Sequence, residues 1–338
     1  MIAADTHPDY LSTKFARELA EAERGAPPRY LSVQHHLAHV LSCMAENELE
    51  PPILGVSWDG TGYGLDGTVW GGEFFLVAQN DLHDESLSRV GQTLVVGGAE
   101  RVAHFRQFQL PGGEAAIKEP RRTALGCLYE LLGEKAFEMD NLAPIRAFTP
   151  AELAALRPML ARRLNSPLTS SAGRLFDAVA SLTGLRQQVR FEGQAAMELE
   201  FALESAHTNE AYELPIVASA KDHASRVTHH ASVLLDWFPL LDGILADLRR
   251  NLSPAEISAK FHNALVEAII RVARRFGERR VVLTGGCFQN RYLTERAVSR
   301  LREEGFRPYW HQRVPPNDGG ISLGQIVAAL RAAFASRE

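Results

Sequence analysis

The pattern of apolar and polar positions predicts that helices and strands alternate in the first part of the chain. Residues 11–23, after a turn at the N-terminus, carry Phe15, Leu19 and Ala20 near helical spacing, and residues 35–46 place their apolar side chains on one helical face. Strands are predicted around these helices, at residues 30–34, 53–58 and 68–78.

The rest of the chain is more helical, and a second alternation of strands and helices closes it. Helical patterns cover residues 120–132, 151–164, 175–182, 195–205, 237–250 and 254–276. The polar segment 207–226 is weakly patterned and fits either an insertion or a short pair of strands. A strand, a helix, a strand and a helix follow at residues 280–284, 290–304, 307–310 and 321–334. This order is typical of an α/β fold.

Length and charge limit the classes of protein to which this chain can belong. With 338 residues, of which 46% are hydrophobic and 23% charged, it is long enough for two lobes and too apolar for a disordered chain. A formal net charge of −5 argues against a broad nucleic-acid surface, and no apolar run approaches the roughly 18 residues of a membrane span. We expect neither nucleic acid nor a membrane as partner.

The cysteines indicate the compartment. The chain has three, widely spaced and without a CxxC pair, which excludes a zinc ribbon and a disulfide framework. Such sparse cysteines are typical of a reducing cytosol, and the first residues lack the apolar core of a signal peptide. We therefore expect a cytoplasmic protein.

The first candidate for chemistry is the HHLAH segment that opens the predicted helix at residues 35–46. His35 and His39 are four residues apart, so a helix places both imidazoles on one face, where they can share a metal ion. A strand directly before the helix puts the pair at a carboxyl edge, where α/β proteins place their sites. The alternative is that one histidine is a cap or core residue and the others are solvated. His36 points elsewhere and could only support such a site.

A glycine-rich turn between two predicted strands is the second candidate. Asp59 precedes Gly60, Thr61 and Gly62, and backbone N–H groups in such a turn can approach phosphate oxygens without a Cβ in the way. The Asp59 carboxylate could bind a metal or orient a nucleotide. The alternative is a plain β-hairpin, because Asp-Gly is a common turn pair.

A double glycine after the predicted strand at residues 280–284 is the third candidate. Gly285 and Gly286 could let a ligand lie flat against the backbone, or they could simply form a tight strand-to-helix turn. The pattern is not GxGxxG, so it does not predict a dinucleotide site. Cys287, with no base predicted beside it, is interpreted as a packing residue.

Two aspartates complete the set. Asp318 precedes two glycines, where it could reach a site as a metal ligand or cap the helix predicted at residues 321–334. Asp177 could accept ribose hydroxyls, although a carboxylate on a helix is more often simply exposed.

Together, and in this order, these motifs resemble the C-terminal carbamoyltransferase domain of the HypF family of [NiFe]-hydrogenase maturation factors. The matching segments are HPDYLST, VQHHLAHV, DGTGYGLDGTVWGGEF, AAIKEPRRTAL, SSAGRLFDAVASL, FEGQAAMELE, LTGGCFQNR and PPNDGGISLGQ, which span residues 7–325. The TsaD family of tRNA threonylcarbamoyl transferases is more distantly similar, in HxxxH, the glycine-rich hairpin, GGxxxN and the late aspartate.

The resemblance implies an actin-like, sugar-kinase-like fold of two RNase-H-type α/β lobes, at about residues 1–120 and 121–338, with nucleotide between them. It implies one divalent metal on His35, His39 and Asp318, with Asp59 as a further ligand. Iron or zinc suits two imidazoles with carboxylates, and magnesium could enter with nucleotide. Asp59 and His36 are the candidate catalytic residues. The implied nucleotide or substrate contacts are Asp59, Gly60, Thr61, Gly62, Gly173, Asp177, Gly193, Gln194, Gly285, Gly286 and Asn290.

The resemblance also implies an activity. The domain would take carbamoyl-adenylate, derived from ATP, and pass the carbamoyl group to the C-terminal cysteine thiolate of HypE, for the cyanide ligands of the hydrogenase. Because the partner supplies the nucleophile, this chain needs none of its own. Two alternatives are a small-molecule O-carbamoyltransferase and a non-catalytic relative that binds nucleotide or a HypE-like partner.

The sequence departs from the full-length family pattern. The acylphosphatase domain, the paired CxxC zinc motifs and the YrdC-like domain have no counterpart in it. We therefore expect only the transfer half-reaction, with the adenylate supplied by another protein. The first lobe is also expected to lack its opening strands, which would leave strand edges unpaired.

Overall fold

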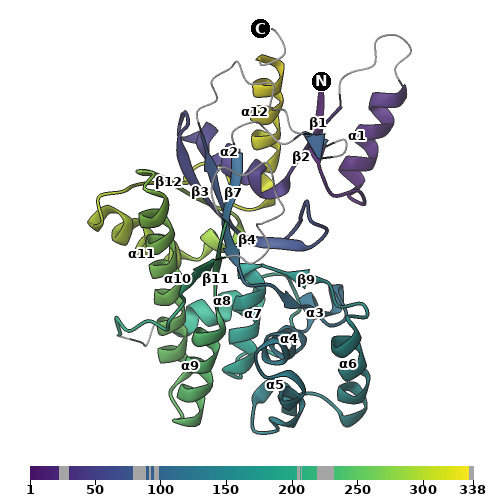
Figure 1. Cartoon of the computed structure of the whole chain (residues 1–338), viewed down its shortest axis with the longest axis vertical. Coiled ribbons are helices and arrows are strands. Elements are labelled where there is room, and N and C mark those ends of the chain that lie inside the picture. The colour runs from purple at the N-terminus through teal and green to yellow at the C-terminus, as the bar shows by residue number, and fades with distance from the viewer. Residues whose placement is uncertain are drawn as a thin grey trace.

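A nine-stranded mixed sheet with helices on both faces lies at the centre of the molecule (Figure 1). The computed structural model describes residues 1–22, 30–78, 89–90, 93–94, 99–203, 206, 208–218 and 232–334. The main strands are, in spatial order, β10 (Ile216–Ala218), β11 (Val233–Leu235), β7 (Ala99–Phe105), β4 (Val69–Val77), β3 (Ile53–Tyr63), β12 (Arg280–Thr284) and β13 (Arg307–Trp310). The short β8 (Phe108–Gln109) and β9 (Leu168–Thr169) join at β4. β3, β4 and β7 are antiparallel, whereas β12 and β13 run parallel to β3.

Alternate residues of the central strands divide the core between two layers of helices. Val281 and Leu283 of β12 face the core that contains α7 (Ala172–Leu182) and α10 (Pro254–Phe276). Val282 faces the opposite side, with α2 (His35–Glu46) and α12 (Ile321–Phe334). This two-fold alternation is what a strand covered on both faces requires.

The helices α2 and α12 pack very closely on the sheet and on each other. A Cβ added to Gly55 of β3 would lie 2.7 Å from a Val40 methyl of α2. A Cβ added to Gly324 of α12 would lie only 1.8 Å from the carbonyl oxygen of Ala38. Glycine at these two positions therefore lets α2 sit directly on the sheet and α12 directly on α2.

Most of the remaining helices surround the opposite face. They are α3 (Glu114–Lys118), α4 (Pro120–Leu132), α5 (Ala143–Arg146), α6 (Pro150–Arg162), α8 (Gln194–Ala202), α9 (Phe238–Arg249) and α11 (Arg291–Glu303), with the 3-10 helices η1 (Gly133–Glu138) and η4 (Gly286–Gln289). The 3-10 helix η5 (Asp318–Gly320) instead lies beside α2 and α12. Helices α6 and α10 begin at capping boxes formed by Thr149 with Glu152 and by Ser253 with Glu256. The long predicted helices are confirmed to within a few residues. The lobe boundary near residue 120 stays a prediction.

The predicted turn at residues 59–67 is wrong in its first half. β3 continues to Tyr63, and its register against β4 shifts between the pairs Trp58–Gly72 and Gly62–Trp70. The chain reverses later, where Gly67 donates a backbone hydrogen bond to Gly64 at 3.0 Å. Asp59 to Thr61 therefore form an irregularity within a strand, a position that glycine tolerates.

A small parallel sheet of β1 (Ile2–Asp5) and β2 (Tyr30–Val33), connected through α1 (Leu11–Ala22), lies near the N-terminus beside α12 (Figure 1). The turn predicted before the first helix is present at Pro8 and Asp9, whereas β1 was not predicted because it is too short to show a pattern. Helix α1 buries Thr13 and Ala16, whereas Phe15 is 61% exposed. Among the described residues β1 pairs only with β2, so its other edge carries no strand.

Some predicted segments fall partly outside the described residues, namely residue 23, residues 204–205, and residues 207 and 219–226. A third short pair, β5 (Arg89–Val90) with β6 (Thr93–Leu94), was not predicted. Within the described residues, no helix is both long enough and apolar enough to span a membrane.

Candidate metal centre and nucleotide pocket

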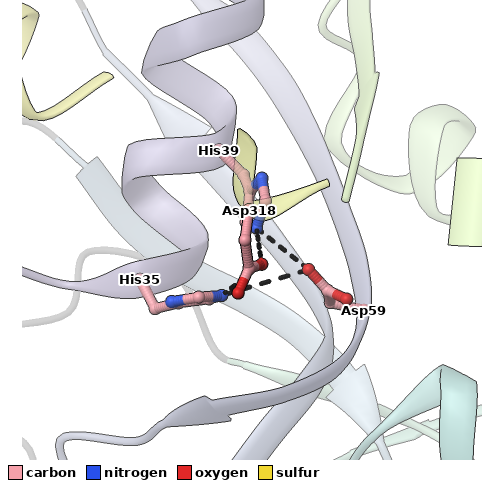
Figure 2. Close-up of side chains that lie close together, drawn as sticks. All are labelled: His35, His39, Asp59 and Asp318. Carbon is pink, nitrogen blue, oxygen red and sulfur yellow. Dashed lines mark ion pairs between the residues drawn. The ribbon is translucent and has the colours of Figure 1, made fainter. Parts of the chain in front are cut away.

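Four side chains from three distant parts of the chain meet at one point (Figure 2). His35 and His39 occupy successive turns at the start of α2, which begins directly after β2 because the Gln34 side chain caps it through Leu37 N–H at 2.9 Å. Asp59 comes from the irregular part of β3, and Asp318 opens η5. The expected convergence of the imidazole pair with the two carboxylates is therefore present.

The distances are those of groups that share one centre. Asp59 Oδ2 lies 2.9 Å from His39 Nε2 and 4.0 Å from His35 Nε2. Asp318 Oδ1 lies 3.5 Å from His35 Nε2 and 3.6 Å from His39 Nε2. One ligand atom from each residue falls within 4.8 Å of the other three, which is the spacing of donors around a single ion.

The ligand atoms of the four-residue centre are left available for a cation. His35 Nε2, His39 Nε2 and Asp59 Oδ2 are buried, and although they lie at ion-pair distances, none of them makes a contact with hydrogen-bond geometry among the described residues. Buried polar atoms normally have a hydrogen-bond partner, so three such atoms that face one another without one favour a shared ligand. Two imidazole nitrogens and two carboxylate oxygens form a donor set that suits zinc or iron.

The protonation equilibria also show that the centre favours positive charge. Burial disfavours the imidazolium of His35, but the carboxylates of Asp318 and Asp5 overcome this and raise its pKa to about 10. Asp318 and Asp59 likewise raise the pKa of His39 against the effect of burial. The two imidazoles in turn hold the pKa of Asp318 well below its usual range. A divalent cation would displace the imidazole protons and take over this charge balance.

Asp5 is a functional candidate that the sequence analysis missed. Its Oδ2 lies 2.8 Å from His35 Nδ1, its Oδ1 accepts the backbone N–H of His7 at 2.8 Å, and the residue is only 4% exposed. A carboxylate on the far nitrogen of a ligating histidine fixes its tautomer and raises its basicity. One sequence feature could have revealed Asp5: it ends a short apolar run, and the carboxyl end of a strand is also the position from which His35 was proposed.

Replacing Asp5 by alanine is expected to weaken Zn²⁺ binding about 10- to 100-fold, the usual effect of removing such a partner. Competition with a chromogenic chelator measures the affinity. Asp5→Asn keeps an acceptor for His35 Nδ1 and should lose less. Asp9→Ala is the control, since the Asp9 side chain is 75% exposed. Equal affinities for wild type and Asp5→Ala would show that Asp5 does not orient His35.

His36 is buried but lies outside the four-residue centre. Its Nδ1 is 3.2 Å from the Gln34 side-chain nitrogen, and its ring faces Gly62, where an added Cβ would lie 2.4 Å from His36 Cε1. Burial and the neighbouring His35 and His39 lower its pKa, so the ring stays neutral. Gly62 thus makes room for the His36 ring. A catalytic role of His36 stays a prediction.

Helix α7 begins against the backbone of Asp59 and Gly60. Ser171, its N-cap, donates its hydroxyl to the carbonyl oxygens of Asp59 at 2.7 Å and of Gly60 at 2.8 Å. A Cβ on Gly173 would lie 2.8 Å from Gly60 Cα, so glycine permits this approach. Gly60, Thr61 and Gly173 are therefore brought beside the centre, and their role as nucleotide contacts stays a prediction.

The double glycine brings η4 against β3 on the other side of Asp59. Gly285 adopts a φ of 97°, and an added Cβ would lie 2.2 Å from the carbonyl oxygen of Trp58. A Cβ on Gly286 would lie 2.8 Å from Asp59 Oδ1. Both positions therefore require glycine, one for its conformation and both for space.

A pocket of about 760 Å³ opens on the far side of Gly286. Its walls come from α8, η4 and the start of α11, and include Gly193, Met197, Cys287 and Asn290. This volume is in the range of small-molecule sites, and the pocket follows the carboxyl end of β12, where α/β folds bind ligands.

Three residues that were predicted to contact nucleotide or substrate interact with other residues of the protein in the structure. The Asn290 side chain caps α11 through Leu293 N–H at 2.8 Å. The Gln194 side chain accepts the backbone N–H of Arg190 at 2.8 Å. Asp177 is buried, not exposed, and lies 3.0 Å from Arg174 Nη1. Their binding roles stay predictions, and for Gln194 the observed bond favours a role in the loop.

A buried carboxylate at the other end of α2 holds the segment that leads to Asp318. Glu46 Oε1 accepts the backbone N–H groups of Gln312 at 2.9 Å and of Arg313 at 2.6 Å, while its Oε2 lies 2.7 Å from His311 Nδ1. His311 Nε2 is 2.9 Å from Thr284 Oγ1, which donates to the carbonyl oxygen of His39 at 3.2 Å.

Comparison with known proteins agrees with this geometry. A family model described as "Carbamoyltransferase, Kae1-like Domain, second subdomain" matches residues 55–325, and one described as "HypF Kae1-like domain" matches residues 1–46. The chain belongs to the HypF family of carbamoyltransferases. The resemblance inferred from the motifs is therefore confirmed, and with it the Kae1-like α/β fold.

Individual HypF relatives align along almost the whole chain. Carbamoyltransferase HypF of Synechocystis sp. is 39% identical, over 98% of this chain and 40% of the relative. A HypF homolog of Cupriavidus necator is 33% identical, over 98% of this chain and 77% of the relative. The chain thus spans about 40% of the length of several of the HypF proteins that it matches.

Solved HypF structures have the same fold. Full-length HypF in a phosphate- and nucleotide-bound form superposes with a TM-score of 0.79 at 38% identity, covering 97% of this chain and 46% of that one. HypF of T. kodakarensis gives a TM-score of 0.80 at 28% identity, covering 99% and 40%.

Proposed function

We propose that the chain transfers a carbamoyl group from carbamoyl-adenylate to the C-terminal cysteine thiolate of HypE. The observation that carries this proposal is the position of Gly286. It lines the pocket, and an added Cβ there would lie 2.8 Å from Asp59 Oδ1 of the four-residue centre. A nucleoside in the pocket would therefore direct its acylated phosphate toward His35 and His39.

The four-residue centre would hold one divalent metal through His35, His39, Asp59 and Asp318. When bound, such an ion supplies Lewis-acid polarisation of carbamoyl and phosphate oxygens. The chain itself supplies position: the backbone around Gly60 would hold the phosphate, while the pocket would hold the base and ribose. Fixing two reactants in this way lowers the entropic part of the barrier.

The nucleophile comes from the partner. Burial raises the pKa of the Cys287 thiol, so the cysteine in the pocket wall stays protonated and unreactive. In the transfer, the thiolate sulfur of HypE forms a bond to the carbamoyl carbon. The carbon–oxygen bond to phosphate breaks, and AMP leaves with its electron pair. No proton or oxidant is needed.

Incubation of the purified chain with preformed carbamoyl-adenylate and a HypE C-terminal peptide tests the proposal. Mass spectrometry should show that the peptide gains one carbamoyl group, whereas a peptide with serine in place of the cysteine should gain none. No gain on the peptide, with carbamoylation of a small alcohol, would indicate an O-carbamoyltransferase instead. Binding of adenylate and peptide without turnover of either acceptor would indicate a non-catalytic relative.

A further inference from the structure

Arg174 is a nearly buried cation that the mechanism above does not use. It stands on the first turns of α7 and is 3% exposed. Its Nη1 lies 3.0 Å from Asp177 Oδ2, yet its Nε and Nη1 make no hydrogen bond within the described residues. A buried guanidinium with so few bonds is costly unless another group completes its shell.

The Nη2 edge of the guanidinium faces Gly60. A Cβ added to Gly60 would lie 3.2 Å from Arg174 Nη2 and 3.3 Å from Glu192 Oε1. Gly60 does not have a left-handed backbone, so its conformation does not require glycine. The missing side chain instead keeps free the space in front of Arg174. Glu192 is exposed and belongs to the pocket wall.

This space lies between the pocket and the four-residue centre. Cys287 lines the pocket, and its thiol, whose pKa burial raises, also feels the charges of Asp59 and Arg174. The N-terminus of α7 points at the same backbone, because Ser171 bonds to the carbonyl oxygens of Asp59 and Gly60. Helix N-termini favour negative charge, and Arg174 adds a full positive charge there.

We propose that Arg174 binds the phosphate of the adenylate and stabilises the negative charge that grows on the departing AMP, and that Asp177 positions the Arg174 side chain. The inference rests on the proposed function and adds a phosphate contact to it. As the bond from the carbamoyl carbon to the phosphate oxygen breaks, the electron pair stays on the phosphate, whose negative charge grows. Arginine presents N–H donors in a planar fork that matches phosphate oxygens, and a fixed cation stabilises such developing charge.

Calorimetric titration of the full chain with AMP and with adenosine tests this assignment. Replacing Arg174 alone would leave Asp177 buried without its cation, so the test variant is Arg174→Gln with Asp177→Asn. Its dissociation constant for AMP should rise about 10- to 100-fold, the value of hydrogen bonds to a charged group. Its affinity for adenosine should equal that of Asp177→Asn alone, which measures any contact of Asp177 with the ribose. Arg174→Lys keeps the positive charge but loses the planar arrangement of N–H donors, so its affinity for AMP should lie between that of wild type and that of the double variant.

The matched control is Arg106→Gln with Asp236→Asn, because that ion pair, at 2.7 Å, lies outside the site described above. Unchanged AMP affinity in the Arg174 double variant, with wild type preferring AMP over adenosine, would overturn the role of Arg174 and leave the proposed function standing. An equal loss for AMP and adenosine, measured relative to Asp177→Asn alone, would show a structural role of Arg174 and also overturn the assignment. A wild type that binds AMP no better than adenosine would contradict both proposals.

Discussion

Replacing His39 or Asp318 by alanine is expected to abolish the binding of a divalent metal. Each change removes one of four donors that lie within 4.8 Å of one another. Loss of a supporting carboxylate typically costs about 10- to 100-fold in affinity, and loss of a ligand itself should cost more. After dialysis against Fe²⁺, Zn²⁺, Mn²⁺ or Ni²⁺, elemental analysis should find about one ion per wild-type chain and almost none in either variant.

The two substitutions differ in how strongly they could destabilise the fold, so a loss of metal in both is more informative than in either alone. The Asp318 side chain is 68% exposed, so Asp318→Ala should leave the core intact, whereas His39 is buried. His104→Ala, a histidine outside the centre, and Asp9→Ala are the controls. Unchanged metal content in both His39→Ala and Asp318→Ala would refute the assignment of the ligands.

Gly324→Ala is expected to destabilise the protein by about 3 kcal/mol or more. Glycine to alanine within a helix is normally worth about 1 kcal/mol of added stability. Here the new Cβ would lie 1.8 Å from the carbonyl oxygen of Ala38, a backbone atom that can yield only if α2 and α12 separate. Overpacking typically costs about 1–3 kcal/mol, and a clash with backbone lies at the upper end or beyond.

Urea unfolding followed by circular dichroism measures this loss. Because α2 carries His35 and His39, its displacement should weaken metal binding in the same variant. Ile326→Ala on the same helix is the control, since that side chain is 56% exposed. An unfolding midpoint for Gly324→Ala equal to that of wild type would show that the two helices are not in such close contact.

Elements with strong periodicity could be predicted from the sequence almost to the residue. α2, α10, β12 and β13 agree with their predicted bounds because each carries a continuous apolar face or run. β7 was missed because charged residues interrupt its pattern. Its Arg101 is tolerated in the sheet only because Glu73 of β4 pairs with it. That compensation comes from a distant strand and cannot be read locally.

The candidate site shows a similar division. The spacing of His35 and His39 follows from helix geometry, whereas the approach of Asp318 depends on how β12, β13 and α12 pack on α2. Only the family resemblance brought Asp318 to the same centre in advance. Asp5 was missed because its relation to His35 depends on the pairing of β1 with β2.

The carboxylate of Glu46 has a consequence for how the centre assembles. The helix α2 carries both imidazoles in its first turns. Through Glu46 in its last turn, it also contacts residues 311–313, a few positions before Asp318. The segment that carries Asp318 is thus fixed to the same helix as the two histidines before a metal ion binds. Capturing an ion then requires little loss of conformational freedom, which is the thermodynamic advantage of a preassembled chelate.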